Sequence, residues 1–202
     1  MSHPAIIRSA VLILGFILSA AAPAQEVLPR RWGHLPMDAN VVGGGVAYSE
    51  GDVAFDPVLL IEDATVELTT YAASYIRTFE LLGKSARVDV TGAYQTGRWE
   101  GLLDGDPAST SRSGLADPKI RLAVNLLGAP PLRGKAFAEH RAKTKSETIV
   151  GAGLWVGLPL GKYYEDKLIN LGNNRFTIVP QLGVVHTRGK WSGELTGAVW
   201  YY

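Results

Sequence analysis

Three groups of residues have types and spacings that could support chemistry, and the first is a possible serine–histidine pair. His186 and Ser192 could form the nucleophile and base of a lipid hydrolase, a pair that needs hydrogen-bond contact and a third, orienting group. His186 falls on the same strand face as Leu182 and Val184, whereas Ser192 falls on a polar face. We therefore expect no catalytic residues and predict that the protein is not an enzyme.

The other two groups are a glycine run and an aspartate pair. Residues 43–45 are all glycine, but a phosphate-binding loop needs a helix directly after it, and a strand pattern surrounds these glycines instead. Asp104 and Asp106 lack a third ligand at the spacing of a calcium-binding loop. The chain contains no cysteine and no zinc-type spacing. We accordingly predict no metal and no cofactor.

The elements that carry these residues have the period of two that is typical of β-strands. Residues 86–98 place Val88 and Val90 on one face and Arg87 and Asp89 on the other. The same alternation recurs, with varying regularity, in residues 40–48, 67–79, 117–126, 148–160, 176–188 and 191–202. The sequence thus predicts seven strands in an all-β, antiparallel fold.

Strand length and loop spacing favour a transmembrane β-barrel. The strands have about 9–13 residues, enough to cross a bilayer at a tilt and longer than most strands of soluble proteins. Long connections at residues 49–65, 99–115 and 161–175 alternate with short ones at residues 80–85 and 188–190, as in outer-membrane barrels. The exception is the long segment 127–147, in which residues 133–141 could form a short helix.

Polar residues on the alternating faces are the candidates for a barrel lumen. They could hydrate or guide a solute, or they could form an ion-pair network that plugs a small barrel. Asp104, Asp106 and Arg112 could form a constriction if the segment 99–115 folds inward, or a solvated surface loop if it does not. The predicted lumen-lining residues are Arg87, Asp89, Gln95, Lys119, Arg121, Asn125, Gln181 and Glu194.

Aromatic residues near the predicted strand ends suit an interfacial girdle, as in other membrane proteins. The alternative is that they stack against an aromatic substrate. The candidates are Tyr71, Tyr75, Tyr94, Trp155, Trp191, Trp200, Tyr201 and Tyr202.

The N-terminal segment and the charge balance indicate an exported protein. Residues 1–24 contain Arg8, an apolar run at residues 10–18 and a cleavage-like end at residues 22–24, the features of a secretory signal rather than a membrane anchor. Loss of Arg8 would leave 19 basic and 19 acidic side chains, which disfavours nucleic acid as a partner. We expect an irregular lead-in at residues 25–39, a barrel domain at residues 40–202, a location in the bacterial outer membrane and contact with its lipid.

Seven strands conflict with the even number that is usual in bacterial barrels. One strand could be hidden in residues 25–39, or the barrel continues beyond these residues, because an unpaired edge is not viable in lipid. We therefore expect an incompletely closed sheet with an edge at residues 191–202.

Several short motifs carry a resemblance to a known family. They are SEGDV at residues 49–53, FDP at 55–57, GRWEG at 97–101, SGLADP at 113–118 and LINLG at 168–172. With these motifs the chain resembles outer-membrane transporters associated with the meta-pathway of phenol degradation. The resemblance implies a larger barrel, and passive uptake of small apolar or aromatic solutes. The alternative is a small structural or interaction barrel with a plugged lumen.

Overall fold

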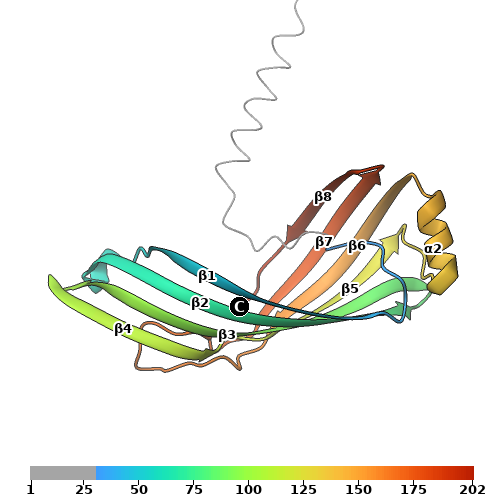
Figure 1. Ribbon diagram of the computed structural model, residues 1–202. Helices are drawn as coiled ribbons and strands as arrows, with labels where there is room; N and C mark the ends of the chain where they lie inside the picture. The colour runs from blue at the N-terminus through green and yellow to red at the C-terminus, as the bar shows by residue number, and fades with distance from the viewer. Residues whose placement is uncertain (1–30) are drawn as a thin grey trace, which may run out of the picture. The chain divides into compact units, whose positions relative to one another are not determined.

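The described part of the chain folds into a single antiparallel sheet with one short α-helix. The computed structural model describes residues 31–202, so the predicted signal at 1–24 and the first part of the lead-in lie outside the described residues. The strands are β1 (Asn40–Asp52), β2 (Ile61–Leu81), β3 (Lys84–Leu103), β4 (Asp106–Leu115), β5 (Lys119–Leu127), β6 (Ser146–Gly157), β7 (Thr177–Arg188) and β8 (Trp191–Ala198) (Figure 1). The helices are η1 (Pro57–Leu59) and α2 (Gly134–Lys143), and neither has the length and hydropathy needed to cross a bilayer.

The strands follow the order β1-β2-β3-β5-β6-β7-β8, and β4 also pairs with β3. The first half of β3 pairs with β5 and its second half with β4, so that β4 and β5 share one position in the sheet. Residues 116–118 separate the two strands, and Pro118 has no N–H to donate to the ladder. Eight strands therefore fill seven positions.

Those seven positions correspond to the seven predicted strands, and the predicted all-β antiparallel fold is confirmed. The sheet curls into an open half-barrel whose edges are β1 and β8 (Figure 1). The expected open edge in residues 191–202 is thus present. The helix expected within residues 133–141 is also confirmed, as α2, which is rich in alanine and has a basic last turn that suits the helix dipole.

Two predicted loops are wrong. β1 continues to Asp52 and β2 begins at Ile61, so that most of the predicted loop 49–65 is strand. The predicted loop 99–115 holds the end of β3, a two-residue turn at Asp104 and Gly105, and β4. Both turn residues have positive φ, 56° and 83°, which is the backbone of the type I′ turn that joins hairpins. β4 escaped prediction because its residues 107–113 are largely serine and threonine, with no apolar face.

The sheet has an apolar outer face and a polar inner face. The outer face bears Val90, Leu122 and Leu182, which are 39 %, 41 % and 63 % exposed. The inner face bears Arg121 and Gln181, which are only 5 % and 8 % exposed. In a water-soluble sheet the exposed face is usually polar, whereas here the exposed face carries large apolar side chains, and the covered face holds charged groups together with the apolar Ile149, Val179 and Val185.

The apolar part of the outer face has a limited height. On β3 it extends from Ala86 to Tyr94, about 26 Å at roughly 3.3 Å per residue, and beyond it the face turns polar at Thr96, Arg98 and Glu100. Tyr71 of β2 is the register partner of Tyr94, so two tyrosines lie side by side at this boundary. We call the apolar stretch, and its continuation across the neighbouring strands, the outer band.

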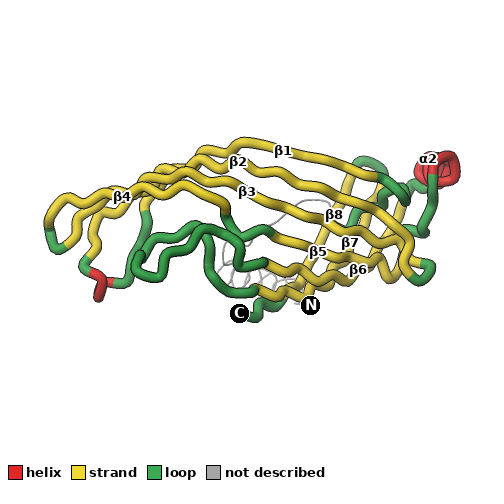
Figure 2. Tube along the Cα trace, turned by 90° about the horizontal axis from the view of Figure 1, so that it is seen from below, coloured by secondary structure: helices red, strands yellow, loops and turns green. Residues whose placement is uncertain are grey.

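The small core lies on the inner face, where residues 32–39 contact the sheet. Trp32 is 1 % exposed and clusters with Ala123, Ala129, Ile149 and Val185. The long hairpin of β3 and β4 and the helix α2 lie at opposite ends of the sheet (Figure 2). The core lies toward the α2 end of β5–β7, because Ile149 is near the start of β6 and Val185 is near the end of β7.

Candidate functional site

The candidate site is a group of charged and aromatic side chains on the inner face, which we call the inner-face cluster. It consists of Trp32, Arg87, Asp89, Arg121 and Gln181. Asp89 of β3 is the register partner of Arg121 of β5, and Arg121 Nη1 lies 3.0 Å from Asp89 Oδ2. Arg87 Nη2 lies 3.2 Å from the same oxygen. Arg121 Nε donates to Gln181 Oε1 of β7 at 3.1 Å, which links three strands.

Trp32 completes the cluster from the lead-in. The Arg121 guanidinium lies 4.6 Å from the centroid of the Trp32 ring, in cation–π contact. The indole Nε1 donates to Thr196 Oγ1 of β8 at 2.9 Å. The ring rests on Gly151 and Gly183, where an added Cβ would come within 2.2 Å and 1.9 Å of ring atoms. Any larger residue at these two positions would displace the indole.

The charged groups of the cluster are arranged around one carboxylate. Asp89 lies between the guanidinium groups of Arg87 and Arg121. The side chains are largely covered, with Arg121 6 % and Asp89 16 % exposed. Because covered charges need partners to offset their desolvation, the three groups depend on each other for their stability.

The other predicted lumen residues lie elsewhere on the inner face. Gln95 Nε2 donates to Thr70 Oγ1 at 3.1 Å, and Asn125 Nδ2 donates to Ser85 Oγ at 3.1 Å. Lys119 Nζ lies 5.3 Å from the Trp155 ring centroid. Glu194 is exposed on β8, opposite Val185. Four of the predicted lumen residues therefore belong to the inner-face cluster: Arg87, Asp89, Arg121 and Gln181. The other four, Gln95, Lys119, Asn125 and Glu194, are separate from it.

The predicted constriction does not form, because its supposed loop is a hairpin that continues the sheet. Asp104 and Asp106 lie exposed at the hairpin turn. Arg112 lies on β4, where its Nε donates to the carbonyl of Ile169 at 3.1 Å. Arg112 therefore attaches the hairpin to the connection between β6 and β7.

The serine and histidine considered for catalysis lie apart, as expected. His186 Nδ1 contacts Thr148 Oγ1 at 2.8 Å, and Ser192 Oγ contacts Thr187 Oγ1 at 3.3 Å. His186 is the register partner of Gly193, so His186 and Ser192 project from opposite faces of the sheet.

The candidate aromatic residues divide between the two faces. Tyr71, Tyr75 and Tyr94 project from the outer face and are 52 %, 38 % and 45 % exposed. Trp191 is 75 % exposed at the start of β8, whereas Trp155 contacts Lys119 on the inner face. The remaining candidates, Trp200, Tyr201 and Tyr202, are exposed at the end of the chain.

A shallow depression of about 380 Å³ lies beside the long hairpin. Its lining includes Tyr48, Glu67, Arg98 and Ser111. Glu67, Arg98 and Ser111 are register partners on adjacent strands and lie on the same face as Tyr94, beyond the outer band. The depression is therefore not part of the inner face.

Sequence reasoning missed two groups of residues. Trp32 belongs to the lead-in, which has no periodic pattern that could reveal a contact with β6 and β7. His34, His140 and Glu147 have the side-chain types of a metal site, and the fold brings them together from distant segments. Neither group has a local motif, so only the fold reveals them.

These features define a class: a barrel-like, all-β protein whose polar side chains face inward. Residues 50–201 match the model of the family described as "Putative MetA-pathway of phenol degradation". The chain belongs to this family, and the resemblance found in the sequence motifs is confirmed. No curated protein and no solved structure matches the chain. The matched region includes Arg87, Asp89, Arg121 and Gln181, whereas Trp32 and His34 precede it.

Proposed function

We propose that the protein is part of an outer-membrane channel for passive uptake of small apolar or aromatic solutes, and that it is not an enzyme. The observation that carries the proposal is the reversed distribution of the two faces, with an apolar outer band and a covered, charged cluster inside. A lipid-facing barrel wall needs this arrangement, since hydrocarbon surrounds it while its lumen is polar.

The height of the outer band supports a location in the membrane. Its length of about 26 Å along β3 corresponds to a height of about 20 Å at a strand tilt of roughly 40°, which is of the same order as the roughly 25 Å apolar band of outer-membrane barrels. Tyr71 and Tyr94 lie at one end of it, where an aromatic girdle would meet the lipid headgroups. Level with Val90 and Val88 of the band, Tyr75 Oη and Arg77 both donate to Asn40 Oδ1, at 2.6 Å and 3.2 Å.

The proposal requires that β1 and β8 are paired in the membrane. Each is an edge of the sheet, and unpaired backbone groups cost several kcal/mol each in hydrocarbon.

The surroundings of Trp32 support aromatic compounds as solutes. The indole ring of Trp32 lies against the Arg121 guanidinium and the backbone of two glycines, Gly151 and Gly183. Its N–H donates to the Thr196 hydroxyl. A phenol could use the same kinds of contact, with its ring near Arg121 and its hydroxyl near Thr196. The family description names phenol degradation, which agrees with solutes of this chemistry.

Conductance and uptake test the proposal. The purified protein is inserted into planar bilayers, and labelled phenol uptake is measured in cells that lack the gene and carry either the wild type or Arg121→Gln. We expect single-channel currents and an uptake defect in the deletion strain, with partial rescue by Arg121→Gln. Arg98→Gln, on the outer face, is the matched control and should rescue fully. Insertion without current, together with normal uptake in the deletion strain, would exclude the channel.

A second candidate function is a structural or interaction barrel with a plugged lumen. It is favoured by the position of residues 32–39, since Trp32 and Met37 are covered at 1 % and 5 % exposure. Trp32→Ala separates the two candidates. It should increase the conductance of a channel that Trp32 narrows, and it should leave a plugged barrel without conductance.

A further inference from the structure

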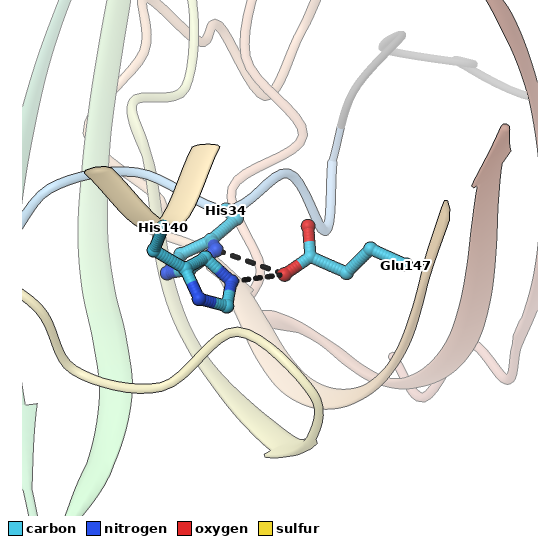
Figure 3. Close-up of side chains that lie close together, drawn as sticks. All are labelled: His34, His140 and Glu147. Atoms are coloured by element: carbon cyan, nitrogen blue, oxygen red, sulfur yellow. Dashed lines mark hydrogen bonds and ion pairs between the residues drawn. The ribbon is translucent and has the colours of Figure 1, made fainter. Parts of the chain in front are cut away.

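Two histidines and a glutamate from three separate segments meet at the end of the sheet next to α2. His34 comes from the lead-in, His140 from the last turn of α2, and Glu147 is the second residue of β6. Their candidate ligand atoms all lie within 4.8 Å of one another. Figure 3 shows both imidazole rings directed at the same carboxylate oxygen, Glu147 Oε1.

The hydrogen bonds of His34 decide which of its nitrogens is available. Nε2 lies 2.9 Å from the carbonyl oxygen of Pro130, and because a carbonyl only accepts, Nε2 carries the hydrogen. In a neutral ring, Nδ1 is then a bare lone pair. This lone pair faces Glu147 Oε1 at 3.0 Å. Two acceptors at this distance need a cation between or beside them, either a proton or a metal ion.

We propose that His34 Nδ1, His140 Nε2 and Glu147 Oε1 bind a divalent transition-metal cation, with Zn²⁺ as the best fit. Two imidazole nitrogens and one carboxylate oxygen are a known ligand set for zinc. Neighbouring ligands of tetrahedral zinc are about 3.3 Å apart, given bonds of roughly 2.0–2.1 Å. Glu147 Oε1 lies 3.0 Å from His34 Nδ1 and 3.3 Å from His140 Nε2. A water molecule would supply the fourth ligand.

The groups around the cluster hold two of the ligands in place. The Pro130 carbonyl fixes the ring of His34 through Nε2, as second-shell acceptors do for histidines that bind metals. Arg141 Nη1 contacts Glu147 Oε2 at 3.3 Å, which leaves Oε1 for the metal. Phe137 packs edge-on against His34, with ring centroids 5.0 Å apart. The His34 side chain is 1 % and that of Glu147 10 % exposed, so the site is shielded on these sides.

Arg141 opposes a metal ion by its charge, but this effect is limited. Its side chain is 46 % exposed, and solvent screens charges that are exposed to this degree. A bound cation is therefore attracted by the carboxylate of Glu147 and repelled, with partial screening, by the guanidinium of Arg141. We expect selectivity for Zn²⁺ over Mg²⁺, because imidazole nitrogen suits borderline cations and not hard ones.

A bound ion would join three parts of the fold. It would attach the lead-in and α2 to the start of β6, close to Trp32, which lies two residues before His34 in the chain. Since a ligand that binds only the folded state stabilises it, zinc should raise the unfolding temperature. This binding does not depend on whether the protein forms a channel.

Calorimetric titration of the folded protein in detergent, without a histidine tag, tests the site. We expect one Zn²⁺ per chain and no saturable binding of Mg²⁺. His140→Ala should weaken zinc binding at least tenfold, because it removes one of three protein ligands. His140 is 30 % exposed in its side chain, so its loss should leave the fold intact. His186→Ala is the matched control, since His186 contacts Thr148 on the outer face, and should bind zinc like the wild type.

Cobalt substitution gives a second measurement that needs no variant. Co²⁺ bound to the wild type should show the strong visible absorption of tetrahedral coordination, and Zn²⁺ should abolish it. Zinc binding that persists in folded His140→Ala, equal losses in His140→Ala and His186→Ala, or no saturable zinc binding in the wild type would each overturn the proposal. The last result would leave a proton as the cation between His34 and Glu147.

Discussion

The two halves of the sheet are paired alike but covered very differently. In β1 all thirteen residues are exposed, although each pairs with β2. In β7 every second residue from Thr177 to Val185 is buried, and the residues between them are exposed or partly exposed. Hydrogen-bonded pairing therefore does not decide burial here. The difference lies in the lead-in, whose Trp32 covers the inner face of β6 and β7.

This contrast indicates where the stability of the fold resides. The core cluster lies on the inner face of β5–β7, and the covered ion pairs lie on β3 and β5, whereas the outer part of the β3–β4 hairpin has mostly exposed side chains. Regions with few buried contacts open at low cost in free energy. Substitutions in the covered half should therefore affect global unfolding, and those in the exposed half should act locally.

The largest effect should come from Trp32→Ala. Loss of a buried aromatic side chain costs about 3–5 kcal/mol of unfolding free energy, and Trp32 is 1 % exposed. Urea unfolding followed by far-ultraviolet circular dichroism measures it. Trp191→Ala is the control, since Trp191 is 75 % exposed and should change stability little. Equal effects of the two substitutions would show that burial of the side chain does not determine its contribution to stability.

Arg121→Met should have the next largest effect. It leaves Asp89 covered with Arg87 as its remaining ionic partner, at a cost of about 3 kcal/mol. Adding Asp89→Asn should increase the loss, because Arg87 then loses its carboxylate partner, and a double-mutant cycle measures the coupling. Arg98→Met is the control, in an ion pair whose side chains are 60 % and 53 % exposed. If Arg98→Met is as costly as Arg121→Met, burial does not control the strength of these pairs.

Two turn glycines give a matched test of a smaller effect. Gly105 turns the β3–β4 hairpin with φ 83°, and Gly189 turns the β7–β8 hairpin with φ 58°. Valine at either position should cost roughly 1–2 kcal/mol, because L-residues resist left-handed backbone. Gly105→Val should speed amide hydrogen exchange in β4 alone, whereas Gly189→Val should lower the protection of β7 and β8 together. Protection of β7 that falls equally in both variants would contradict local opening of the hairpin.

The smallest effect should follow Arg133→Ala. Arg133 Nε lies 2.7 Å from Asp38 Oδ2 and Nη1 lies 3.1 Å from Glu80 Oε2. The hydrogen bond to Asp38 and, next in size, that to Glu80 raise the pKa of Arg133 above its ordinary value. A raised pKa stabilises the fold at all pH values below the unfolded value, so titration of Arg133 should cause no change near neutral pH. The small loss of unfolding free energy on substitution should vanish in high salt, because both ion pairs of Arg133 are exposed. A loss that salt leaves unchanged would indicate that packing of the side chain, and not its charge, is responsible.

Much of the fold was predictable because strand faces alternate strictly. The parity of residues 86–95 alone assigned Arg87 and Asp89 to the polar face of their strand. The same rule assigned Arg121 and Gln181 to the polar faces of theirs. β4 was missed because its serines and threonines give both faces the same polarity. The Asp104–Gly105 pair was the available signal, since this dipeptide favours a type I′ hairpin.

Contacts between distant segments could not be predicted in this way. Trp32 fits against Gly151 and Gly183, and the sequence showed only that the facing side chains of β6 are small. His34, His140 and Glu147 come together through the paths of the lead-in and α2, which no periodicity describes. Alternation assigns a residue to a face, but not to a partner that lies on an irregular segment.

The contact between Trp32 and Thr196 also bears on the order of folding. The two residues are 164 positions apart, so during synthesis the indole emerges long before the strand that accepts its hydrogen bond. Contacts of such high sequence separation form slowly, because a long loop must close first. The lead-in should therefore reach its final position as one of the last steps, and burial of Trp32 should mark the completion of folding.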